Sequence, residues 1–312
     1  MKRTIVLVSI LVFVSQLLKA QDTLYIHQKT GGIIKIEVNN IDSIVFNTNA
    51  LKIDPGTVAA SNLVAYFPFE SESGSIATGD GITFNKKAGD ASFVPGRRGN
   101  AYKGSRNQAF LEYNVAPDNI FKNLREYSYA AWIKCPGSNN GAASVFSLNG
   151  GDVNLGNFGF VVESASNADS LALNSYLYNS TAVWFLQNQY SFNKAFLTDK
   201  WIHIVCSYNK ATSTMSVYAN GMLIDEGIKY ADSSQANGTQ PLLGDLSLAV
   251  ATKFHIGAWS IEAEGSTENV WMLYYPGLLD ELRFYNKALT AFEIKSLYEA
   301  ELTQVNSSPP RL

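Results

Sequence analysis

The 312-residue chain has few cysteines, few histidines and no excess of positive charge. Two cysteines are too few for a disulfide scaffold, and three histidines offer no zinc-ligand spacing. The 24 basic residues are scattered and outnumbered by 27 acidic ones, whereas nucleic-acid binding needs a concentrated basic patch. We therefore expect no nucleic-acid partner. Cys135 and Cys206 lie in apolar stretches, which favours two buried thiols, although an oxidising compartment would also permit a disulfide.

Long apolar runs are absent after the first twenty residues. Residues 1–20 combine Lys2 and Arg3 with the apolar run "TIVLVSILVFVSQLL" and a small-residue end at Ala20, as a cleaved secretory signal does. A retained anchor needs about twenty apolar residues, and polar residues interrupt this shorter run. We expect an exported mature chain without a membrane span, in the periplasm, on the cell surface or outside the cell. Losing three basic residues lowers its formal charge from −3 to −6.

The remaining sequence divides into four parts. Residues 21–46 predict a small β unit, with two strands around a Thr30-Gly31-Gly32 turn and a third strand ending at Phe46. Such a unit is too small to be stable alone and must pack on something else. Residues 47–62 are rich in small and turn-forming residues and predict a linker. Residues 63–302 predict the main domain, and residues 303–312 lack apolar periodicity and predict a disordered tail.

The main domain is a series of short, aromatic-rich strands separated by Gly, Asn and Ser. Asn220-Gly221 is the strongest hairpin signal, because both residues tolerate the positive φ of a type I′ turn. Many short strands at this spacing predict an all-β fold of two packed antiparallel sheets.

One helix is predicted near the C-terminus, in "LTAFEIKSLYEAEL". Thr290 and Glu293 have the spacing of a capping box, and Leu289 can pack against Ile294 across the helix start. The predicted apolar stripe consists of Ile294, Leu297, Tyr298 and Leu302. We expect this stripe to pack against the sandwich.

The stretch "PGLLDELRFYN" raises a question about Asp280. Regular strand alternation places its carboxylate on the apolar face, with Leu278, Leu282 and Phe284. A carboxylate in that position needs a hydrogen-bond partner, a proton or a cation.

Several segments resemble the laminin-G-like, concanavalin A-like jelly rolls of secreted bacterial proteins, among them "NLVAYFPFE", "DKWIHIVCSYNKATSTMSVYANGMLI" and "GLLDELRFYNKALTAFEIKSLYEAE". The resemblance implies an antiparallel jelly roll that binds glycans or proteins. It also implies a structural calcium ion, with Asp280 and Glu70 at the ligand positions. The loop after Glu70 departs from the family's pattern. The alternative is that Asp280 accepts backbone N–H bonds or pairs with a basic side chain.

Aromatic residues are the candidates for ligand contact, because sugar C–H faces stack on exposed rings. The candidates are Trp271, Tyr274 and Tyr275, followed by Trp184 and Tyr190. The competing interpretation is that these rings pack inside the sandwich.

Two other functions stay open at this stage. A glycoside hydrolase or lyase on the same fold would need paired carboxylates, but "SIEAEG" offers Glu262 and Glu264 without the third acid of the laminarinase pattern. His203 and Ser207 have no nucleophile-elbow sequence beside them, so no acyl-transfer enzyme is predicted. A structural or interaction subunit of an envelope complex is the third possibility, with the N-terminal hairpin adding a strand to a partner.

Overall fold

The computed structural model describes residues 23–27, 33–37, 55–71, 81–136, 141–148, 158–164, 170–179, 183–187, 191–193, 199–231, 241–248, 251–259 and 272–302. The chain divides into two compact units, Met1–Leu51 and Lys52–Leu312. In the first unit, β1 (Thr23–His27) pairs with β2 (Ile33–Glu37) as an antiparallel hairpin. The predicted signal peptide, the third strand ending at Phe46 and the C-terminal tail lie outside the described residues.

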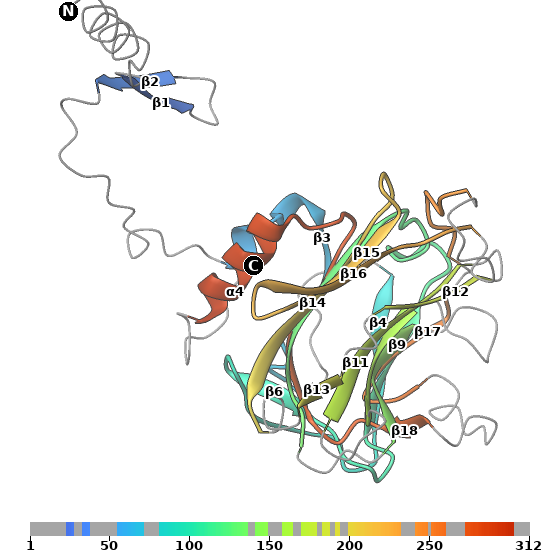
Figure 1. The fold of residues 1–312 in the computed structure, drawn as a ribbon. Coiled ribbons are helices and arrows are strands. Elements are labelled where there is room, and N and C mark those ends of the chain that lie inside the picture. The colour runs from blue at the N-terminus through green and yellow to red at the C-terminus, as the bar shows by residue number, and fades with distance from the viewer. Residues whose placement is uncertain are drawn as a thin grey trace, which may run out of the picture. The chain divides into compact units, whose positions relative to one another are not determined.

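The second unit is a two-sheet sandwich, which confirms the predicted jelly-roll fold (Figure 1). In its described part, one sheet has nine strands in the order β12-β11-β10-β9-β17-β7-β4, with β13 beside β11 and β18 beside β9. These strands are β4 (Ile82–Ala88), β7 (Phe110–Val115), β9 (Ala142–Leu148), β10 (Phe158–Ser164), β11 (Ser170–Asn179), β12 (Val183–Gln187), β13 (Ser191–Asn193), β17 (Lys253–Ile256) and β18 (Met272–Tyr274).

The second sheet has eight strands among the described residues, in the order β16-β15-β14-β8-β19-β6-β5, with β3 beside β19. These are β3 (Leu63–Phe67), β5 (Ser92–Pro95), β6 (Asn100–Lys103), β8 (Tyr127–Lys134), β14 (Trp201–Asn209), β15 (Thr214–Ala219), β16 (Met222–Ile228) and β19 (Leu278–Tyr285). The predicted Asn220-Gly221 turn joins β15 to β16, and both residues have positive φ, 50° and 76°.

Aromatic side chains fill the space between the sheets. Phe284 packs edge-on against Phe146 and Phe121, with ring centroids 5.4 and 5.3 Å apart, and Phe67 lies 5.3 Å from Phe254. The thiols of Cys135 and Cys206 are free and buried, as the sequence favoured. The core therefore comes from the inward residues of both sheets, as sandwich packing requires.

Strand β19 departs from the regular alternation that the sequence predicted. Its register with β8 shifts between Asp280 and Arg283, and Glu281 has φ of +53°. This β-bulge inserts one residue, so Leu279, Leu282 and Phe284 enter the core. Asp280 pairs instead with Trp132 and leaves the apolar face. The prediction that Asp280 points inward with Leu282 and Phe284 was therefore wrong, because it assumed regular alternation of side chains and the sequence pattern does not reveal a bulge.

Helix α4 (Ala291–Leu302) packs on the outer face of the eight-stranded sheet. Its capping box is confirmed: Glu293 N–H donates to Thr290 Oγ1 over 3.2 Å, and Thr290 N–H donates to Glu293 Oε2 over 2.8 Å. Ile294 and Leu297 are buried as predicted, but Leu302 is exposed and Glu301 takes the inward position at the helix end. No described helix is both long enough and apolar enough to cross a membrane.

The expected linker, residues 47–62, contains structure in its described part. Two short 3-10 helices, η2 (Pro55–Thr57) and η3 (Ala60–Asn62), precede β3. Val58 between them is buried in a small apolar cluster with Leu289 and Leu297. This end of the segment therefore belongs to the sandwich unit, because its apolar side chain covers the base of α4.

Candidate functional site

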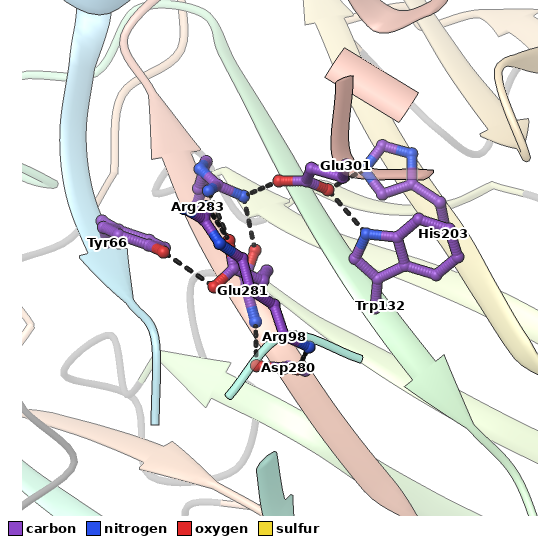
Figure 2. A network of polar contacts seen from close by, with 8 residues as sticks. All are labelled: Tyr66, Arg98, Trp132, His203, Asp280, Glu281, Arg283 and Glu301. Carbon is purple, nitrogen blue, oxygen red and sulfur yellow. Dashed lines mark hydrogen bonds and ion pairs between the residues drawn. The ribbon is translucent and has the colours of Figure 1, made fainter. Parts of the chain in front are cut away.

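A network of buried polar and charged side chains lies between α4 and the outer face of the eight-stranded sheet (Figure 2). This network, called the buried network below, comprises Tyr66, Arg98, Trp132, His203, Asp280, Glu281, Arg283 and Glu301. Each of these residues is at most 4% exposed. The bulge in β19 contributes to this arrangement, because it brings Asp280 to the same outer face as Glu281 and Arg283.

Glu281 is the acceptor at the centre of the network. Its Oε1 accepts a hydrogen bond from Tyr66 Oη at 2.7 Å, and its Oε2 accepts from Arg283 Nη2 at 2.6 Å and from Arg98 Nη1 at 3.5 Å. Burial raises the pKa of the Tyr66 hydroxyl well above its usual range, so this group acts as a donor. The guanidinium of Arg283 also lies over the Tyr66 ring, 4.3 Å from its centroid. Every oxygen of this buried carboxylate is therefore paired.

Glu301 connects the network to α4. Its Oε1 accepts from Arg283 Nη1, and its Oε2 accepts from Trp132 Nε1 at 2.6 Å. His203 Nε2 lies 3.6 Å from the same Oε2, and neither ring nitrogen of His203 makes a hydrogen bond. Burial and the neighbouring Arg283 charge lower the pKa of His203 to about 3, so the ring is neutral at pH 7. This arrangement serves structure, since every member is sealed from solvent.

Asp280 and Glu70 hold the loop between β5 and β6 from two sides. Asp280 Oδ2 accepts the N–H of Arg98 and its Oδ1 accepts the N–H of Glu281, each at 2.9 Å. This contact is the backbone-capping alternative that the sequence left open. Burial raises the pKa of Asp280 well above its usual range, and the charge of Glu281 adds to that effect.

Glu70 has one oxygen satisfied and one not. Its Oε2 accepts the N–H of Asn100 at 3.2 Å, whereas its buried Oε1 has no hydrogen-bond partner. A Cβ at Gly99 would lie 2.0 Å from this Oε1, so only glycine fits beside it. Burial raises the pKa of Glu70. The described residues contain no group of three or more His, Cys, Asp or Glu side chains that would hold a metal ion.

The nine-stranded sheet carries a second charged cluster on its outer face. Glu112 on β7 accepts from Lys253 Nζ at 2.9 Å and from Asn85 Nδ2, and its Oε2 lies 3.1 Å from His255 Nε2. Burial alone would raise the pKa of Glu112, but these hydrogen bonds outweigh it and lower the pKa to about 2. Burial lowers the pKa of His255 to about 4. At neutral pH an ionised Glu112 therefore faces a neutral imidazole.

Tyr274 and Tyr275 are adjacent in sequence but have opposite environments. Tyr274, at the end of β18, is partly exposed, and its ring stacks on Phe110 with centroids 6.1 Å apart and planes 17° apart. Tyr275 is only 1% exposed, and its hydroxyl donates to the carbonyls of Leu278 and Lys134 at 3.2 and 3.3 Å. Tyr275 offers no surface to a ligand, because alternation along the chain turns its ring into the core.

The other aromatic candidates are less fully described. Trp184 lies on β12 opposite Tyr178 of β11, at the edge of the nine-stranded sheet. Trp271 and Tyr190 lie outside the described residues, as do Glu262 and Glu264. Of the five predicted aromatic contacts, Tyr274 is the one whose side chain the structure describes as accessible.

Sequence reasoning missed Glu301, Glu281 and Arg283 as one unit. Helix periodicity assigned Leu302 rather than Glu301 to the packed side, and strand alternation placed Glu281 and Arg283 on the face opposite the apolar residues without a partner. Trp132 on β8 pairs with His203 of β14 on one side and with Asp280 of β19 on the other. The sequence does not give the register of these strands, so it does not reveal this grouping.

The fold defines a two-sheet jelly roll, and comparison with known proteins gives its family. The model described as the concanavalin A-like lectin/glucanases superfamily matches residues 112–295. The chain belongs to this family. None of the curated proteins compared matches it.

Solved structures share the fold at low sequence identity. The receptor-binding domain of botulinum neurotoxin D has a TM-score of 0.52 at 13% identity, covering 78% of this chain and 54% of that one. The binding domain of Paraclostridial Mosquitocidal Protein 1 has a TM-score of 0.51 at 16% identity, covering 76% and 52%. This chain thus spans about half the length of those structures.

Proposed function

We propose that this chain is an exported, non-catalytic recognition module that binds carbohydrate through the outer face of its nine-stranded sheet. The observation that carries the proposal is Tyr274, a partly exposed ring stacked on Phe110 in a chain of the lectin/glucanase superfamily. Export is part of the proposal and depends on the signal-like residues 1–20.

The surroundings of Tyr274 suit a sugar. A ring fixed by a second aromatic presents a flat apolar surface at low entropic cost, and polar groups at its rim can bond hydroxyls. Arg106 Nη1 donates to the Tyr274 carbonyl at 3.0 Å, and Lys86 Nζ lies 5.4 Å from the Phe110 centroid. Both cations therefore lie beside the stacked pair, where they can donate to ligand oxygens.

The carboxylates on this face support binding rather than glycoside hydrolysis. A general acid needs a raised pKa, whereas the pKa of Glu112 is about 2. Glu163 on β10 is three strands away, a separation of about 14 Å at ~4.8 Å per strand. Retaining hydrolysis uses carboxyl groups about 5–5.5 Å apart. These two acids do not fit that requirement.

A glycan array probed with purified residues 21–312 tests the proposal. We expect selective binding that falls at least about ten-fold in Tyr274→Ala, since truncating an aromatic anchor of an interface typically costs about 2 kcal/mol or more. Tyr230→Ala is the matched control, because Tyr230 is also partly exposed but lies at the β-bridge to Leu242. Equal binding by wild type and Tyr274→Ala would contradict this site. A blank array from folded protein would favour a protein receptor as the ligand.

We also propose a structural calcium ion at Glu70. The unpartnered buried Oε1 of Glu70 supports it, because calcium prefers carboxylate and carbonyl oxygens. Asp280 would act indirectly, by fixing the loop whose N–H groups it accepts. Calcium should raise the melting temperature of wild type and leave Glu70→Gln unchanged. If wild type gives the same melting temperature in calcium and in chelator, a protonated Glu70 carboxyl replaces the ion.

A further inference from the structure

A polar groove lies on the outer face of the eight-stranded sheet, away from Tyr274. It is bounded by β14, β15 and β16 on one side and by the loop that leads into α4 on the other. Its volume is about 280 Å³. Cross-strand pairing aligns Ser207, Ser216 and Glu226 in one row across its floor. Tyr218 adds apolar surface to the same groove.

The groove offers hydroxyl groups that the fold does not fully use. Ser207 Oγ is 3.0 Å from Ser128 Oγ, and Thr290 Oγ1 is engaged by Glu293 in the capping box. In the part of the chain that the structure describes, the Ser216 hydroxyl, the Tyr218 hydroxyl and the Glu226 carboxylate enter no hydrogen bond with the protein. These three groups converge on one space and are available to a ligand with several hydroxyls.

The charge of the groove restricts the chemical class of ligand that can bind there. Glu226 contributes a carboxylate, and none of the lining residues is lysine, arginine or histidine. The burial of Tyr218 raises the pKa of its hydroxyl, and the Glu226 charge adds to the effect, so this group is a donor at neutral pH. A carboxylate with no cation beside it repels anions and accepts hydrogen bonds from vicinal hydroxyls.

We propose that this groove binds one unit of a neutral sugar. Glu226 and Ser216 bond ligand hydroxyls, and the Tyr218 ring contacts the ligand's C–H surface. A volume of about 280 Å³ lies just below the ~300–1,000 Å³ of small-ligand sites and matches a single ring rather than a long chain. The site is separate from the Tyr274 surface and would make the module bivalent, with one contact on each sheet.

The test uses ¹H–¹⁵N spectra of the full mature chain, titrated with glucose, galactose, mannose, N-acetylglucosamine and glucuronate. We expect at least one neutral sugar to shift the amides around Ser207 and Ser216, and glucuronate to bind at least about ten-fold more weakly. Glu226→Gln and Ser216→Ala should each weaken binding about ten-fold, as the loss of a hydrogen bond in a ligand site does. Glu299→Gln and Ser92→Ala are matched controls, because Glu299 is on α4 and Ser92 on β5, outside the groove.

Each outcome decides the proposal. Groove shifts that persist in Tyr274→Ala and need about ten-fold more sugar in Glu226→Gln support it, whatever the result at the Tyr274 surface. Sugar binding that is unchanged in both Glu226→Gln and Ser216→Ala overturns it. Glucuronate binding as tight as glucose overturns the assignment to neutral sugars. No shift from any of these sugars at the highest concentration tested also overturns it.

Discussion

Polar groups of the sheet are buried at one end of α4 and open to solvent at the other. At the C-terminal end, Glu301 and Arg283 belong to a network in which every residue is at most 4% exposed. At the N-terminal end, Ser216 and Glu226 line an open groove and leave hydrogen-bonding groups for solvent. The same helix thus closes one polar cluster and borders another.

This contrast distinguishes carboxylates that stabilise the fold from carboxylates that are available to bind a ligand. A buried carboxylate persists when opposed charges and donors satisfy it, as Tyr66, Arg98 and Arg283 do for Glu281. Such a group has no capacity left for a ligand. An exposed carboxylate among hydroxyls retains that capacity, because water is its only competitor.

The largest effect on stability is expected from a substitution in the buried network at the C-terminal end of α4. Arg283→Met removes the cation between Glu281 and Glu301 and leaves two buried carboxylates without their main partner. We expect a loss of about 3–5 kcal/mol in the free energy of unfolding, measured by urea denaturation. Arg125→Met is the control, because Arg125 is exposed and bonds only backbone carbonyls. A loss below about 1 kcal/mol would mean that the network does not secure α4.

The sequence predicted the sandwich, the Asn220-Gly221 hairpin and the capped helix, because local patterns determine all three. Alternation of apolar residues identifies strands, and Thr290 with Glu293 marks the helix start within four residues. These features need no knowledge of distant contacts.

The candidate sites were less predictable, because they depend on register. One inserted residue in β19 moved Asp280 off the apolar face, to the outer face that carries Glu281 and Arg283. Likewise, Tyr274 and Tyr275 were equal candidates by composition, yet strand geometry exposes one and buries the other. The groove beside α4 joins Ser207, Ser216 and Glu226 from three strands, and no local motif signals that combination.

A smaller effect is expected from the pH dependence of stability at the C-terminal end of α4, where His203 is buried. His203 is 1% exposed and has no hydrogen bond at either nitrogen. Its ring contacts the rings of Trp132 and Tyr298, with centroids 5.2 and 5.9 Å away. Its folded pKa of about 3 is below the unfolded value of about 6.5, so folding favours the neutral ring. The stability due to this group is present above pH 6.5 and is lost as the pH falls toward 3.

His203→Phe removes this titration while it keeps a planar ring in the stack. Because the histidine nitrogens make no hydrogen bonds, we expect little change in the free energy of unfolding at pH 7. Between pH 6.5 and 4 the variant should lose less stability than wild type, by on the order of 2–3 kcal/mol. Urea denaturation across this pH range measures the difference. Parallel pH curves for the two proteins would mean that His203 accepts a proton in the folded state, with Glu301, 3.6 Å away, as the group that stabilises the charge.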